Sequence, residues 1–157
     1  MWRYIQRFVL TTFVVSQSLI GIGLSPVEHA LAVVTCNGLA VTIAGTAAGE
    51  VINGTAGADV IAGNGGNDTV NGLGGADTIC TDGGDDTITT TGGNYWIDAG
   101  DGTNTVHAGG VANTLTTGTG NDTIDAGSGN DTISSGSGND TIDAGGGANT
   151  VTAGDGD

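Results

Sequence analysis

Large aliphatic residues recur at every ninth position through most of this 157-residue chain. With a frame set at Gly45, twelve units of nine residues follow one another to position 152 without an insertion or a deletion. The eighth position of every unit is aliphatic, and its neighbours at positions 7 and 9 are mostly small and polar. A fixed period of this kind predicts a repeat architecture. The aliphatic residues are Ile52, Ile61, Val70, Ile79, Ile88, Ile97, Val106, Leu115, Ile124, Ile133, Ile142 and Val151.

Each unit divides into a short strand and a tight turn. Positions 7 to 9 are commonly Thr, an aliphatic residue and a polar residue, which suits a short strand with one side chain facing inward. Positions 1 to 6 are rich in Gly and Asn, which adopt the positive φ angles of tight turns easily. Gly stands at position 4 of ten units, and Asp stands at position 6 of seven. Helix is disfavoured because Gly and β-branched residues recur too often for a helical turn to persist.

Two units make one coil of eighteen residues, in the order strand, turn, strand, turn. Successive coils are expected to stack about 4.8 Å apart, which gives two parallel sheets with the aliphatic column between them. The sequence therefore predicts an all-β fold, a parallel β-roll or β-solenoid, over residues 45–157. Residues 33–44 precede the frame but keep Ile43 in the position-8 register, and they predict an N-terminal cap strand.

The first 32 residues are typical of a secretory signal peptide. Arg3 and Arg7 form a positive n-region, residues 8–24 are mostly apolar, and Ala30-Leu31-Ala32 offers a cleavage site. A retained membrane helix is the alternative, but several Thr, Ser and Gln residues interrupt the apolar stretch. We expect a signal peptide over residues 1–32, a secreted mature chain, and no membrane association of that chain.

Removal of the signal peptide leaves a chain without Lys or Arg. Of the 17 acidic residues only Glu28 leaves with it, so sixteen remain. A surface of this charge repels nucleic acid and anionic lipid, and it repels itself when compact. We expect no nucleic-acid partner, and we expect metal ions to offset the charge. Zinc is disfavoured because His107 and two Cys form no cluster of ligands in the sequence.

These units resemble the repeats-in-toxin family, also called hemolysin-type calcium-binding repeats, whose nonapeptide is G-G-x-G-x-D-x-U-x with U a large aliphatic residue. Residues 63–71 (GNGGNDTVN) and 126–134 (AGSGNDTIS) match this pattern closely. The resemblance implies a parallel β-roll that binds several calcium ions between turns stacked on the same side. It also implies the ligands, which are position-6 Asp carboxylates and carbonyl groups of the Gly-rich turns. Calcium accepts about six to eight oxygen ligands in irregular geometry, which agrees with such turns.

The candidate calcium ligands all lie in the turns. A metal-free solenoid, in which the Asp residues only stabilise turns, is the alternative. The candidates are the carboxylates of Asp59, Asp68, Asp77, Asp86, Asp122, Asp131 and Asp140, with Gly66, Gly75, Gly120 and Gly129 as carbonyl donors.

Alternate units stack on one side of the roll, so the acids are expected to pair across coils. Residues 90–116 depart from the repeat pattern, because Tyr95, Asn104 and Asn113 replace the position-6 acid. We therefore expect two calcium-bearing blocks separated by a metal-poor waist. The expected pairs are Asp68 with Asp86, Asp122 with Asp140, and Asp59 with Asp77. Weaker sites are expected where Glu50 lies over Asp68 and where Asp131 lies over Asn149.

Two further features are left open by the sequence. Cys36 and Cys80 are the only cysteines, and a regular roll would hold them more than two coils apart, so a disulfide requires the cap to fold back.

Tyr95 and Trp96 are the only aromatic residues beyond the signal peptide. They form either an exposed binding spot, with Trp96 facing outward, or an aromatic filling of an absent calcium site.

The sequence favours a small calcium-binding protein with a structural or surface role. Outward Thr and Ser side chains at 114–116, 132–134 and 150–152 would form rows that resemble ice-binding surfaces, although Thr is also common on exposed strands. Such an ice-binding or adhesive solenoid is an alternative. An enzyme is not expected, because no Ser–His–Asp set and no paired carboxylates in a cleft are recognisable. A fragment of a larger secreted toxin or enzyme is a further alternative, since the sequence stops at Asp157 within a repeat.

Overall fold

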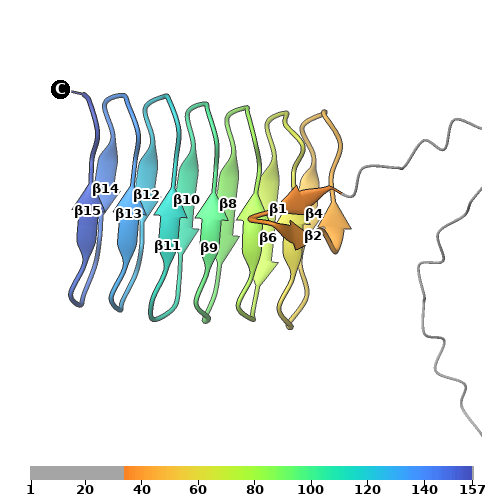
Figure 1. The fold of residues 1–157 in the computed structure, drawn as a ribbon, viewed down its shortest axis with the longest axis horizontal. Helices are drawn as coiled ribbons and strands as arrows, with labels where there is room; N and C mark the ends of the chain where they lie inside the picture. The colour runs from red at the N-terminus through yellow and green to blue at the C-terminus, as the bar shows by residue number, and fades with distance from the viewer. Residues whose placement is uncertain (1–33, 157) are drawn as a thin grey trace, which may run out of the picture. The chain divides into compact units, whose positions relative to one another are not determined.

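The computed structural model describes residues 34–156, and the whole of this region is built from short strands and turns (Figure 1). The expected signal peptide, residues 1–32, lies outside the described residues. No helix within the described residues is long and apolar enough to cross a membrane.

Two parallel sheets form the roll, and consecutive strands alternate between them (Figure 1). The sheet of even-numbered strands, here called the even sheet, has six strands, and the sheet of odd-numbered strands, here called the odd sheet, has seven. The even sheet contains β4 (Val51–Asn53), β6 (Thr69–Leu73), β8 (Thr87–Thr90), β10 (Thr105–Ala108), β12 (Thr123–Asp125) and β14 (Thr141–Asp143). The odd sheet contains β3 (Ile43–Ala44), β5 (Val60–Ala62), β7 (Thr78–Cys80), β9 (Trp96–Asp98), β11 (Thr114–Thr116), β13 (Thr132–Ser134) and β15 (Thr150–Thr152).

The register of the sheets follows the sequence repeat. Neighbouring strands pair residues that are eighteen positions apart, as Ile61, Ile79 and Ile97 show in the odd sheet. The even sheet keeps the same register except at Leu73, where the pairing shifts at a bulge between β6 and β8. The predicted all-β parallel β-roll with eighteen residues per coil is confirmed.

The aliphatic residues at position 8 form one continuous core between the two sheets. All of them are buried except the last two, Ile142 and Val151, which belong to the final coil. Burial of such a side chain stabilises the fold by roughly 1.5–3 kcal/mol. A second inward column, which the sequence did not reveal, consists of small residues at position 1. Its members include Thr81, Ala99, Thr117, Ala126 and Ser135, each at most 2% exposed.

The cap folds back over the first coils. Its described part contains β1 (Thr35–Cys36) and β2 (Leu39–Ala40), an antiparallel hairpin, followed by β3. Asn37 and Gly38 form its two-residue turn with φ angles of 50° and 75°, as a right-twisted hairpin requires. Strand β1 lies against β5 and β7 of the odd sheet, and Cys36 forms a disulfide with Cys80 over a Cα–Cα distance of 5.8 Å. The hairpin provides the fold-back that the disulfide needs.

Candidate metal centre

The turns are stacked in two columns, one on each side of the roll. First-side turns lead into the even sheet and cover residues 45–50, 63–68, 81–86, 99–104, 117–122 and 135–140. Second-side turns lead into the odd sheet and cover residues 54–59, 72–77, 90–95, 108–113, 126–131 and 144–149.

Stacked turns approach one another closely at position 4. Gly120 has a φ of +137°, and a Cβ built on it would lie 1.9 Å from the carbonyl oxygen of Gly102 in the preceding coil. Gly129 has a φ of +126°, and its Cβ would lie 1.5 Å from the carbonyl oxygen of Val111. Gly is therefore required at these positions, both for the backbone conformation and for space. The candidate carbonyl donors Gly66 and Gly75 also have positive φ angles, of 94° and 116°.

The position-6 side chains form a hydrogen-bonded ladder from coil to coil. In each expected Asp pair, the Oδ1 atom of one Asp accepts a hydrogen bond from the backbone N–H of the Asp one coil earlier. The three donor–acceptor distances are 2.8 Å from Asp68 to Asp86, 2.9 Å from Asp122 to Asp140, and 3.0 Å from Asp59 to Asp77. The structure therefore brings together all three expected pairs.

The second carboxylate oxygen, Oδ2, is a buried acceptor without a hydrogen-bond partner at most of the candidate sites. The side chains of Asp68, Asp77 and Asp122 are each only 1% exposed. Burial of an ionised carboxylate without compensation is strongly unfavourable, and residues 34–156 contain no Lys or Arg to compensate it. The Asp residues whose Oδ2 has no partner are Asp68, Asp77, Asp86, Asp122, Asp131 and Asp140.

The environment of these carboxyls opposes their ionisation. Burial raises the pKa of Asp68, Asp77 and Asp86, and the charge of neighbouring acidic residues raises it further. A backbone hydrogen bond, and at Asp86 also a hydrogen bond from the Thr81 side chain, partly offsets these effects. A bound cation would reverse this balance, because an adjacent positive charge favours the carboxylate form.

The oxygen-rich surroundings fit calcium better than a transition metal. Among the described residues, no three His, Cys, Asp or Glu side chains gather into a metal-binding group, and a cation in these turns would take backbone carbonyl oxygens beside the Asp carboxylates. Calcium accepts carbonyl and carboxylate oxygens in flexible geometry, whereas structural zinc needs a closed set of Cys and His ligands. At the C-terminal end of the first side, Asp140 lines a cavity of about 150 Å³ with Gly138, Ala153, Gly154 and Gly156.

Asp59 differs from the other candidate ligands. Its Oδ2 atom accepts hydrogen bonds from the backbone N–H of Thr55 at 2.7 Å and from the Thr55 hydroxyl at 2.9 Å. Thr46 makes the same pair of contacts to Glu50 in the first turn of the other column. Thr at position 2 therefore satisfies the acid within the first coil, an effect that the repeat pattern alone did not reveal.

Tyr95 fills the position-6 site in its turn. The side chain is 2% exposed, and a Cβ built on Gly93 would lie 3.1 Å from its Cζ atom, so the ring occupies the space beneath the turn. Its hydroxyl donates a hydrogen bond to the carbonyl of Leu73 at 3.3 Å. Trp96 is half-buried on the outward side of β9. The sequence left two interpretations of Tyr95 and Trp96, an exposed binding spot or an aromatic filling of an absent calcium site. The packing of Tyr95 favours the second.

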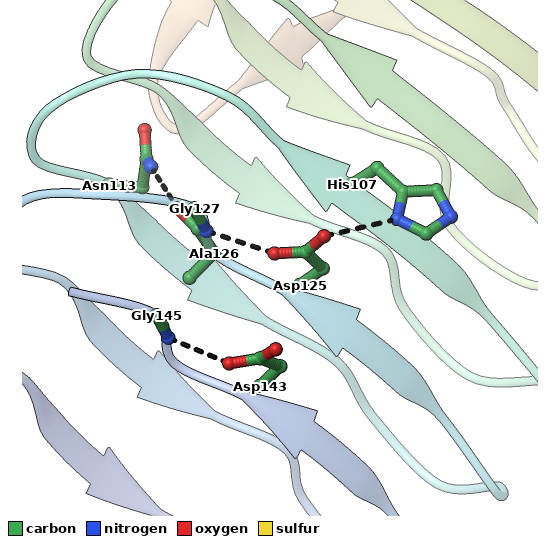
Figure 2. A network of polar contacts seen from close by, with 7 residues as sticks. All are labelled: His107, Asn113, Asp125, Ala126, Gly127, Asp143 and Gly145. Atoms are coloured by element: carbon green, nitrogen blue, oxygen red, sulfur yellow. Dashed lines mark hydrogen bonds and ion pairs between the residues drawn. The ribbon is translucent and has the colours of Figure 1, made fainter.

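His107 lies outside the turn columns, on the outward face of the even sheet (Figure 2). Its Nδ1 atom is 3.8 Å from Oδ2 of Asp125, and both side chains are about half exposed. Asp125 and Asp143 each accept a hydrogen bond through Oδ1 from the N–H two residues later, at Gly127 and Gly145. These acids stabilise the start of a turn and do not face the stacked carbonyl groups.

A family model for the RTX calcium-binding nonapeptide repeat matches this chain in four copies, over residues 44–79, 81–115, 107–142 and 134–157. The chain belongs to this family. The RTX match extends over all twelve sequence units and both columns of turns. No curated protein and no solved structure matches the chain significantly.

Proposed function

We propose that this RTX protein is a secreted calcium-binding β-roll with a structural or surface role, in which calcium ions between the Gly/Asp turns stabilise the fold. The observation that carries the proposal is the set of buried Oδ2 atoms without donors, in a region that has no Lys or Arg side chain. The signal-like N-terminal segment supports export, and the proposal assigns no catalytic role to the roll.

Folding is expected to depend on the ion. Ordering the backbone costs on the order of 1–2 kcal/mol per residue, and the narrow aliphatic column must offset that cost while the acids repel one another. Calcium that binds only the folded roll stabilises it by mass action. The turns then gain a cation at the point where their carbonyl and carboxylate oxygens converge.

Circular dichroism of the secreted chain tests this proposal. In a chelator the protein should be largely disordered, and titration with calcium should produce a strand signal together with several bound ions per chain by calorimetry. Magnesium at the same concentration is the control, because its stricter octahedral geometry and reluctant dehydration suit these turns poorly. A strand signal that is the same in chelator and in calcium would contradict the proposal.

The odd sheet supplies a specific reason to keep ice binding as a second candidate. The register aligns Thr114, Thr132 and Thr150 in one outward row and Thr116, Ser134 and Thr152 in another. An ice-binding role predicts thermal hysteresis that is lost when Thr132, in the middle of the first row, is replaced by a bulky residue. Absence of thermal hysteresis in the calcium-loaded protein would remove this candidate.

A further inference from the structure

Three Asn residues continue the position-6 ladder without carrying a charge. The Oδ1 atom of Asn104 accepts a hydrogen bond from the backbone N–H of Asp86 at 3.0 Å, as an Asp does in the neighbouring coils. Asn113 accepts from Tyr95 at 3.1 Å, and Asn149 accepts from Asp131 at 2.9 Å. The Oδ1 atom of each Asn therefore accepts the same inter-coil hydrogen bond as Oδ1 of an Asp.

The other half of each amide is a donor that meets the carbonyl groups of the turns. The Nδ2 atom of Asn104 donates to the carbonyl of Gly100 at 3.1 Å. Nδ2 of Asn149 donates to the carbonyl of Ala144 at 2.7 Å. Asn113 donates across to Ala126, in the next turn of its column, at 3.1 Å (Figure 2). The NH₂ group of each Asn thus takes the place of the Oδ2 atom of an Asp, which can only accept a hydrogen bond.

We propose that Asn104, Asn113 and Asn149 are built-in replacements for calcium, and that the ions are confined to the turns whose position-6 Oδ2 has no donor. This inference rests on the proposed calcium function and specifies which turns carry it out. In a turn whose Asp Oδ2 has no donor, that oxygen and the turn carbonyls are all acceptors, and a cation satisfies them together. In an Asn turn, the side-chain amide donates a hydrogen bond to a turn carbonyl, and the polar groups are satisfied without an ion.

The Thr-closed turns of the first coil belong to the same class. There the acid itself is satisfied, because the Thr55 N–H and hydroxyl occupy Oδ2 of Asp59. Tyr95 closes its turn with an aromatic ring. The ion-free turns therefore lie in the first coil, at the waist around residues 90–113 and at the last second-side turn. The open carboxylates lie in the two blocks between them.

A gain-of-site variant tests the inference with the full secreted chain. Asn104→Asp changes one NH₂ group to an oxygen at a residue that is 1% exposed, and it places a carboxylate between Asp86 and Asp122 in the first-side column. We expect calcium stoichiometry, measured by equilibrium dialysis, to rise by at least one ion per chain. The matched control is Asn94→Asp, which adds the same charge at an exposed turn position outside the ladder. It should leave the stoichiometry unchanged.

The reciprocal variant keeps the test decisive if Asn104→Asp fails to fold. Asp122→Asn preserves the acceptor for the N–H of Asn104 and supplies an amide donor, so it should lose at least one ion while its strand signal in saturating calcium stays at the wild-type level. An unchanged ion count in Asp122→Asn, or in a folded Asn104→Asp, would overturn the inference. If the wild-type chain binds no calcium at all, the proposed function fails instead.

Discussion

At the scale of single residues, the turns differ mainly in the side chain at position 6. Asp and Asn have nearly the same shape and both accept the inter-coil hydrogen bond, as Asp140 and Asn104 show. They differ in one group, which is an acceptor in Asp and a donor in Asn. Because the surrounding turn offers mainly carbonyl oxygens, we propose that this difference, together with Thr at position 2 in the first coil, decides which turns take a cation.

The same carboxyls predict how the metal-free protein responds to pH. The pKa of Asp68, Asp77 and Asp86 is raised above 3.8 in the folded roll, chiefly by burial. Protonation therefore favours the folded state. Its contribution is fully present below the unfolded pKa and is lost as the pH rises through the raised folded value.

In a chelator, acidification from neutral pH to about pH 4 should thus increase the strand signal measured by circular dichroism. The wild-type protein in saturating calcium provides the reference signal at neutral pH. A strand signal that falls on acidification of the chelated protein would contradict this expectation.

At the scale of the turn, the close approach of stacked position-4 residues predicts that Gly→Ala substitutions at different glycines differ sharply in their effect on stability. Gly120→Ala forces a Cβ to within 1.9 Å of the carbonyl oxygen of Gly102 at a φ of +137°. We expect a loss of about 1–3 kcal/mol in the free energy of unfolding, together with weaker calcium binding. Chemical denaturation in saturating calcium measures the first effect, and calorimetry measures the second.

Gly146→Ala is the matched control for this substitution. A Cβ on Gly146 meets no heavy atom within 4 Å, and its backbone does not lie in the left-handed region. Its unfolding midpoint should stay close to that of the wild type. Equal destabilisation by the two variants would show that loss of Gly flexibility, and not the stacking of the turns, is responsible.

The hairpin is the second element with a distinct energetic role. The Cys36–Cys80 disulfide ties it to β7 across a sequence separation of 44 residues, while the roll itself runs from β3 onward. Reduction, or the Cys36→Ser variant, should lower the free energy of unfolding by about 2–4 kcal/mol and leave most of the strand signal in calcium intact. A denaturation series with and without reductant measures this. Loss of the whole strand signal would mean that the hairpin is needed for the roll to form.

At the scale of the whole molecule, the sequence predicts what repeats and leaves open what depends on local hydrogen-bond geometry. The nine-residue period predicts both sheets, their register and the aliphatic column, because each follows from spacing alone. The closure of the Asp59 turn by Thr55 and of the Asn104 turn by its own amide depends on donor positions within a turn. The Cys36–Cys80 disulfide depends on a fold-back outside the repeat. These features follow from the three-dimensional arrangement and not from the spacing of the repeat.

The stacking of coils also predicts how the cost of a core substitution varies along the roll. Each coil contacts mainly its two neighbours, so a repeat protein gains stability from nearest-neighbour interfaces. Ile97 is fully buried in the middle of the roll, and Ile97→Ala should cost about 2–5 kcal/mol of unfolding free energy. Ile142 is only half-buried in the final coil, so Ile142→Ala should cost clearly less.

Denaturation of both variants in saturating calcium measures this gradient, and hydrogen exchange shows where protection is lost. For Ile142→Ala we expect loss of protection to remain near β14 and β15. For Ile97→Ala we expect it to spread to coils on both sides, because the substitution weakens the interfaces with both neighbouring coils. Equal costs for the two variants would contradict this gradient.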